Sequence, residues 1–102
     1  MEKIINGKKY STETGESLAT YEYGNATNWE YVYEELYKTK KGTYFLYYKG
    51  GAMSKYSESV GNGGSSGSAG IELLTEEEAK EFMVSYASVD EYEQEFGEVE
   101  EG

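Results

Sequence analysis

The 102-residue chain contains no cysteine, histidine, proline or arginine. Without cysteine and histidine it cannot form disulfides, zinc sites built from thiolates or imidazoles, or the catalytic groups of cysteine proteases and serine–histidine hydrolases. No apolar run approaches the ~18 residues of a membrane-spanning helix, and the N-terminal residues alternate with charge instead of forming the apolar core of a signal peptide. We therefore expect an intracellular protein that binds a partner, uses no cofactor or metal and is not an enzyme.

The acidic excess lies in the last third of the chain. Residues 1–70 hold eight acidic residues and eight lysines, whereas residues 71–102 hold twelve acidic residues and only one lysine, Lys80, which accounts for the whole net charge of −11. A block of like charge repels nucleic acid and anionic membranes and favours a partner with a basic surface. The expected partner is therefore a basic protein, with no direct binding to nucleic acid or to membranes.

Turn and cap signals predict the first elements of the fold. The pair Asn6-Gly7 predicts a hairpin over residues 3–10, because both turn residues tolerate positive φ. Thr12 is a candidate cap for a short helix that carries Leu18. This helix would contain Gly15, which lowers helix propensity by about 1 kcal/mol relative to alanine.

Residues 29–38 fit both helical spacing and strand alternation. We favour a strand, because the segment is rich in tyrosine and valine, residues that are enriched in strands. Gly42 is suited to the left-handed position of a bulged hairpin that leads into a second strand over residues 43–48. These two strands are expected to form the centre of the sheet.

A glycine- and serine-rich stretch over residues 61–70 is expected to form a flexible loop, because it has too little side chain to pack. It lacks the Gly-Lys-Ser/Thr ending of a phosphate-binding loop, and it precedes an expected strand over residues 71–74 where such loops precede a helix. Nucleotide binding is therefore not expected here.

Two capping boxes predict two C-terminal helices. Thr75 with Glu78 begins the first, and Ser88 with Glu91 begins the second. Gly97 is placed to end the second helix. Near-exclusive use of glutamate in this region agrees with helices, because glutamate is a better helix former than aspartate.

Together these elements predict one α+β domain over residues 1–97, followed by a disordered acidic tail over residues 98–102. The domain would consist of a small antiparallel sheet with an N-terminal hairpin, a short N-terminal helix and C-terminal acidic helices packed on one side. In the second C-terminal helix, Val89, Tyr92 and Phe96 share one face.

The acidic helices also predict a binding surface. Acidic residues three or four apart on a helix recur about every 5 Å, near the spacing of phosphates along one nucleic-acid strand. The candidate residues for such a nucleic-acid mimic are Glu77, Glu81, Asp90, Glu91, Glu93 and Glu95. The alternative is a solvated face that keeps the protein soluble, and charge alone favours neither interpretation. Catalysis by paired carboxylates is not expected, because a helix N-terminus favours the charged form.

The chain is also rich in tyrosine, with 12 residues. Most of these side chains should pack in the core while their hydroxyls reach water or a partner. Tyr47, Tyr48 and Tyr56, near the Gly50-Gly51 turn, are candidate partner contacts, because tyrosine is enriched at interface hot spots.

Five segments carry a family resemblance: KIINGKKYSTET (3–14), ELYKTKKGTYFLYYKGG (35–51), SKYSES (54–59), LTEEEAKEF (74–82) and VDEYEQEFG (89–97). Together they resemble a family of small acidic proteins from phages, plasmids and conjugative elements of Gram-positive bacteria, some of which are anti-CRISPR inhibitors of type II systems. The resemblance implies an inhibitor that acts in the bacterial cytoplasm by stoichiometric binding to Cas9 or to its complex with guide RNA. It carries over no catalytic residue. The alternative is an acidic regulatory, adaptor or antitoxin-like protein that binds another basic, nucleic-acid-handling protein.

Overall fold

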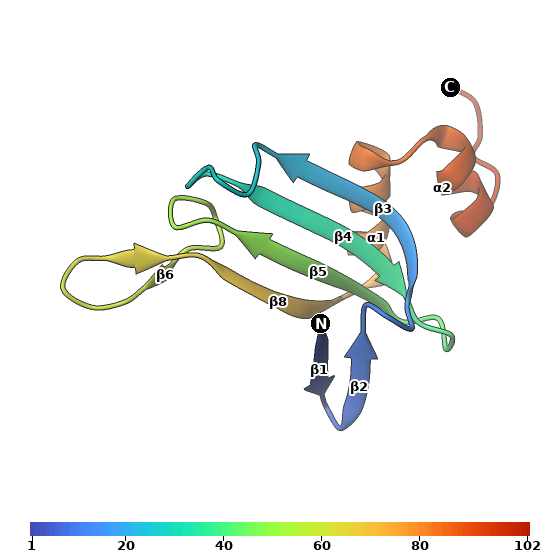
Figure 1. The fold of residues 1–102 in the computed structure, drawn as a ribbon. Helices are drawn as coiled ribbons and strands as arrows, with labels where there is room; N and C mark the ends of the chain where they lie inside the picture. Colours follow the sequence, from blue (N-terminus) through green and yellow to red (C-terminus); the bar gives the residue numbers. More distant parts are fainter.

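The computed structural model describes all 102 residues as a four-stranded antiparallel sheet with two helices on one face and a two-stranded hairpin on the other (Figure 1). The sheet has the strand order β3-β4-β5-β8, and a second small hairpin, β6-β7, extends from it. The elements are β1 (Glu2–Ile5), β2 (Lys8–Ser11), β3 (Glu16–Tyr23), β4 (Val32–Lys38), β5 (Tyr44–Gly50), β6 (Glu58–Ser59), β7 (Ser65–Ser66), β8 (Ser68–Leu74), α1 (Glu76–Tyr86) and α2 (Val89–Phe96). The α+β class and the antiparallel sheet agree with the sequence prediction.

The main core lies between the sheet and the helices. Leu36 of β4 pairs with Leu46 of β5, and both pack against Ala79 and Met83 of α1. These four side chains are buried, and Met83 is among the largest fully buried side chains of the protein. The central position of β4 and β5 confirms a strand, not a helix, over residues 32–38 and its hairpin partner, whereas residues 29–31 of the predicted strand lie outside it.

A second core lies under the N-terminal hairpin. Tyr10 of β2 contacts the ring of Phe45 edge-on, with 5.8 Å between ring centroids, and Tyr37 stacks on the same ring at 5.1 Å. Ile71 completes this buried cluster. Asn6 and Gly7 both have positive φ, which confirms the predicted hairpin turn.

The predicted N-terminal helix is wrong. Residues 12–14 form only a turn, in which the Gly15 N–H donates to the Ser11 carbonyl at 3.0 Å, and the chain then enters strand β3. Gly15 lies directly on the second core, since a Cβ atom there would be 3.0 Å from the Phe45 ring. The glycine that weakened the helix prediction therefore lies in close contact with an aromatic ring from a distant strand.

A β-bulge explains why the β3 sequence does not alternate. The pairing of β3 with β4 shifts register between Ser17 and Ala19. As a result Leu18 and Ala19, neighbours in the chain, both pack against the helix-side core. A bulge of this kind interrupts the period-2 pattern by which a strand is predicted.

The prediction of a loop throughout residues 61–70 is also wrong. Ser65–Ser66 pairs with Glu58–Ser59 as β7, and β8 begins at Ser68, three residues before the predicted strand. Gly70 faces the ring of Tyr48 across the β5–β8 pair, and a Cβ atom there would be 2.5 Å from the tyrosine hydroxyl. Part of the glycine content is therefore required by close packing.

A candidate protein-binding surface on the C-terminal helices

Local hydrogen bonds fix where the two acidic helices begin. The Thr75 hydroxyl accepts from the Glu78 N–H at 3.1 Å, and the Glu78 carboxylate accepts from the Thr75 N–H at 2.9 Å. Ser88 and Glu91 form the same reciprocal pair at the start of α2. Hydrogen bonds from Ser88, chiefly from its backbone, hold the pKa of Glu91 below its usual value. Both capping boxes are confirmed, and Gly97 ends α2 with a φ of 94°.

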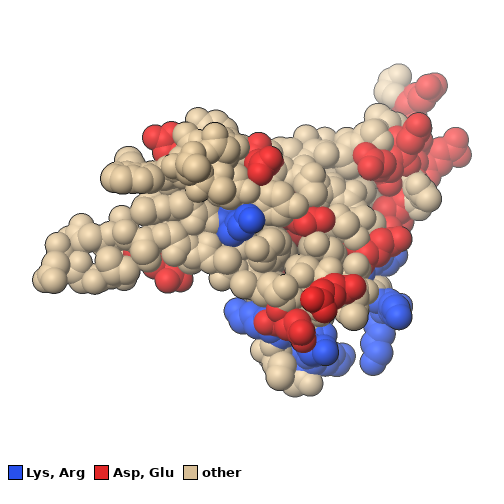
Figure 2. Space-filling model, viewed as in Figure 1, with Lys and Arg blue, Asp and Glu red and all other residues tan.

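Four of the six predicted acidic residues are exposed. Glu77 and Glu81 lie one turn apart on α1, and Asp90 and Glu91 lie in the first turn of α2. Figure 2 shows acidic side chains gathered over the end of the molecule that carries the C-terminal helices and tail. The structure thus places these charges on one end of the protein, while Glu91 also serves as a cap.

Glu95 does not belong to this surface. Its side chain is only 11% exposed, and its carboxylate lies 2.6 Å from the Lys38 ammonium and accepts a hydrogen bond from the Tyr44 hydroxyl at 2.6 Å. The hydrogen bond with Glu95 raises the pKa of Lys38, and burial, followed by the bond to Glu95, raises the pKa of Tyr44. Glu95 therefore connects α2 to the sheet and is not available to a partner.

Glu93 is half-buried and also has an internal role. Its carboxylate accepts from the Val99 N–H at 2.8 Å, so it holds the start of the C-terminal tail against α2. The predicted six-residue mimic is thereby reduced to residues on α1 and the first turn of α2. Sequence spacing could not exclude Glu93 or Glu95, because their partners lie outside their own helix.

The structure adds an exposed apolar patch that the sequence prediction missed. Val84, Val89 and Val99 are 71%, 72% and 53% exposed, and they line a shallow cavity of about 280 Å³ together with Met83 and Tyr92. The sequence placed Val89 on one face with Tyr92 and Phe96, but Val89 is exposed while the two aromatic rings pack against the helix-side core. We call Val84, Val89 and Val99 the valine patch.

Exposed acidic residues lie next to two of the patch valines along the chain. Asp90 follows Val89 in the sequence, Glu98 and Glu100 flank Val99, and all three acidic side chains are exposed. Protein interfaces commonly combine an apolar centre with a polar rim, and exposed apolar clusters mark interaction sites. The C-terminal helices therefore present an apolar centre with an acidic rim.

The three candidate tyrosines do not form one surface. Tyr47 and Tyr48 are consecutive in β5 and point to opposite faces of the sheet. Tyr48 stacks on Tyr56 with 4.3 Å between ring centroids, and the Tyr56 hydroxyl donates to the buried carboxylate of Glu34. Burial, followed by this hydrogen bond, raises the pKa of Tyr56. Tyr48 and Tyr56 are thus part of an internal network on the helix side of the sheet.

Tyr47 lies on the opposite face, where it is half-buried and packs against the second core under the N-terminal hairpin. Its ring meets that of Tyr33 edge-on at 6.2 Å, and Lys49 lies over the Tyr33 ring at 5.2 Å. Burial and a hydrogen bond to Glu35 raise the pKa of Tyr33 to about 12. Of the three candidates, only Tyr47 therefore lies on the face without helices.

Comparison with known proteins adds no assignment, since no family model, curated protein or solved structure matches this chain. No three or more acidic side chains are grouped so that they could hold a metal ion. Neither helix is long and apolar enough to cross a membrane.

Proposed function

We propose that this protein inhibits a nucleic-acid-handling enzyme by stoichiometric binding to a basic surface of that enzyme, and that the target is a type II Cas9 effector. The observation that carries the proposal is the valine patch with its acidic rim. The resemblance of the sequence to anti-CRISPR proteins supplies the class of target. Cas9-type enzymes hold guide and target strands in positively charged channels, which such a surface complements.

The two parts of the surface have different physical roles. Exposed acidic residues of the two helices, such as Glu81 and Asp90, speed association with a basic groove, and added salt weakens their effect by screening. The valine patch contributes affinity, because its apolar area leaves water on binding. A purely electrostatic mimic would depend only on the acidic residues.

The direct test is a Cas9 cleavage assay in which this protein is added before guide loading, after guide loading or after target binding. We expect inhibition to saturate at a fixed molar ratio, and the order of addition that still inhibits identifies the blocked step. Binding to a basic protein without inhibition of Cas9 would favour the alternative, an antitoxin-like or adaptor protein that uses the same surface.

Matched variants test the surface itself. The double variant Glu81→Lys with Asp90→Lys should weaken inhibition about tenfold or more, because one reversed charge on each acidic helix then repels the basic partner. The control is Glu30→Lys with Glu58→Lys, which makes the same change in net charge at exposed positions outside the helices. Circular dichroism checks that both variants fold. Equal inhibition by the two variants would refute the assignment of this surface.

The valine patch is tested separately by Val84→Ser with Val89→Ser. Both side chains are exposed, so their replacement should change stability little. Loss of inhibition in this variant would show that apolar contact contributes to binding. Unchanged inhibition combined with a steep salt dependence would leave the acidic rim as the whole interface.

A further inference from the structure

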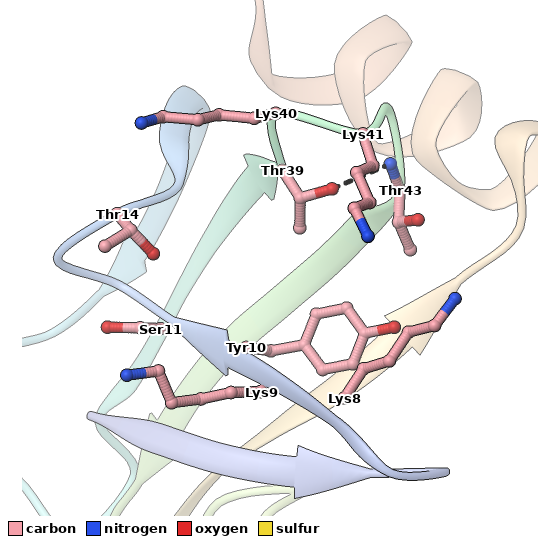
Figure 3. Close-up of a pocket in the computed structure, with 9 residues that line it drawn as sticks. All are labelled: Lys8, Lys9, Tyr10, Ser11, Thr14, Thr39, Lys40, Lys41 and Thr43. Carbon is pink, nitrogen blue, oxygen red and sulfur yellow. Dashed lines mark hydrogen bonds between the residues drawn. The ribbon is translucent and has the colours of Figure 1, made fainter.

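A second charged site lies between β2 and the β4–β5 turn, on the hairpin side of the protein. A cavity of about 510 Å³ opens there, lined by Lys8, Lys9, Lys40 and Lys41 (Figure 3). Each of the other five lining residues carries a hydroxyl group, and no acidic residue lines the cavity. We call this site the lysine cavity.

The four lysines line the cavity from two segments that are distant in the sequence, and in Figure 3 the ends of Lys8 and Lys40 point to opposite sides of it. Lys8 and Lys9 lie on β2, which is anchored by the buried ring of Tyr10 against the sheet. Lys40 and Lys41 lie in a turn that is closed by a hydrogen bond from the Thr39 N–H to the Thr43 carbonyl at 2.8 Å. In Figure 3 the Lys41 side chain extends from this turn into the space above β2.

The positive charge of the lysine cavity is almost uncompensated. Lys9 has the only acidic partner, Glu2 at 3.4 Å, and both side chains are more than half exposed, so this pair contributes little. Lys8, Lys40 and Lys41 form no ion pair, although the chain has 20 acidic residues. Grouped like charges in a concave site raise the local concentration of anions.

The lining indicates which anion fits. Lysine ammonium groups bind phosphate as point charges, and hydroxyls supply further hydrogen-bond donors. The cavity is larger than one phosphate needs and lies within the usual size range of ligand sites. Its one aromatic ring, Tyr10, is already packed against Phe45, so no free ring is present to stack on a base.

We propose that the lysine cavity binds a compact polyphosphate group, recognised through its phosphates, as in inorganic triphosphate or the triphosphate of a nucleotide. A long nucleic acid fits the site less well, because it needs a track of positive charge and would meet the repulsion of a chain with net charge −11. This site is independent of the proposed contact with a basic protein, since it lies on other elements and has the opposite charge.

The test titrates inorganic triphosphate, ATP and a short single-stranded oligonucleotide into the full-length protein by isothermal titration calorimetry. We expect triphosphate and ATP to bind with similar affinity, and amide chemical-shift changes to centre on residues 8–11 and 39–43. The variant Lys40→Ala with Lys41→Ala should weaken triphosphate binding at least tenfold. The control Lys49→Ala, on β5 and outside the lysine cavity, should leave triphosphate binding unchanged.

Three results would overturn the proposal. They are no triphosphate binding by the unmodified protein, an equal loss in the Lys49→Ala control, or tighter binding of the oligonucleotide than of triphosphate. Thermal unfolding of each variant separates loss of the site from loss of the fold, because exposed lysines on a turn contribute little to stability.

Discussion

Replacing Glu95 by alanine should destabilise the protein markedly, whereas replacing an exposed acidic residue of α1 should not. Glu95 accepts a hydrogen bond from Tyr44 and pairs with Lys38, whose side chain is 33% exposed. A hydrogen bond to a charged group contributes about 1.5–3 kcal/mol, and a partly exposed ion pair adds up to about 1 kcal/mol. We expect a loss of about 2–3 kcal/mol in the free energy of unfolding. In a domain of this size that corresponds to a decrease in Tm of roughly 10–20 °C.

Urea denaturation followed by circular dichroism measures this loss directly, with Glu81→Ala as the control. Glu81 is exposed on α1, so its replacement should stay within about 0.5 kcal/mol of the unmodified protein. A double-mutant cycle with Tyr44→Phe should recover a coupling energy of about 1 kcal/mol or more. If Glu95→Ala and Glu81→Ala have the same small effect, Glu95 does not connect α2 to the sheet and belongs to the acidic surface.

Two further predictions concern packing and pH. Gly70→Ala should destabilise the protein by about 1–3 kcal/mol, because the new Cβ atom would collide with the Tyr48 side chain. In urea melts, combining it with Tyr48→Ala should relieve part of that loss. The half-buried Tyr33 should make stability fall at alkaline pH, because its pKa is raised from 10.0 to about 12. The unfolded chain releases this proton first, so the stabilisation that is present below about pH 10 is lost as the pH rises toward 12. Urea midpoints that stay constant across this pH range would contradict the burial of this hydroxyl group.

The parts of the fold that were predicted correctly depend on contacts within a few residues. The Asn6-Gly7 turn and the two capping boxes are satisfied by neighbouring atoms, so their residue types are sufficient to identify them. β3 was predicted wrongly because its form depends on distant residues. Gly15 packs closely against Phe45, and the bulge that turns Leu18 and Ala19 to one side is defined only by pairing with β4.

For the candidate sites, too, the local sequence predicts some features and distant packing decides the others. The amino-acid sequence by itself determined that the negative charge of the protein lies in the C-terminal helices and tail, because charge is a property of residue type and position along the chain. Only the tertiary structure decided that Glu95 is used internally, that Val89 is exposed, and that Lys8 and Lys41 share one cavity. The physical reason is that the partners of a charged side chain and the exposure of an apolar one depend on which distant segments pack beside it, and no local pattern records that packing.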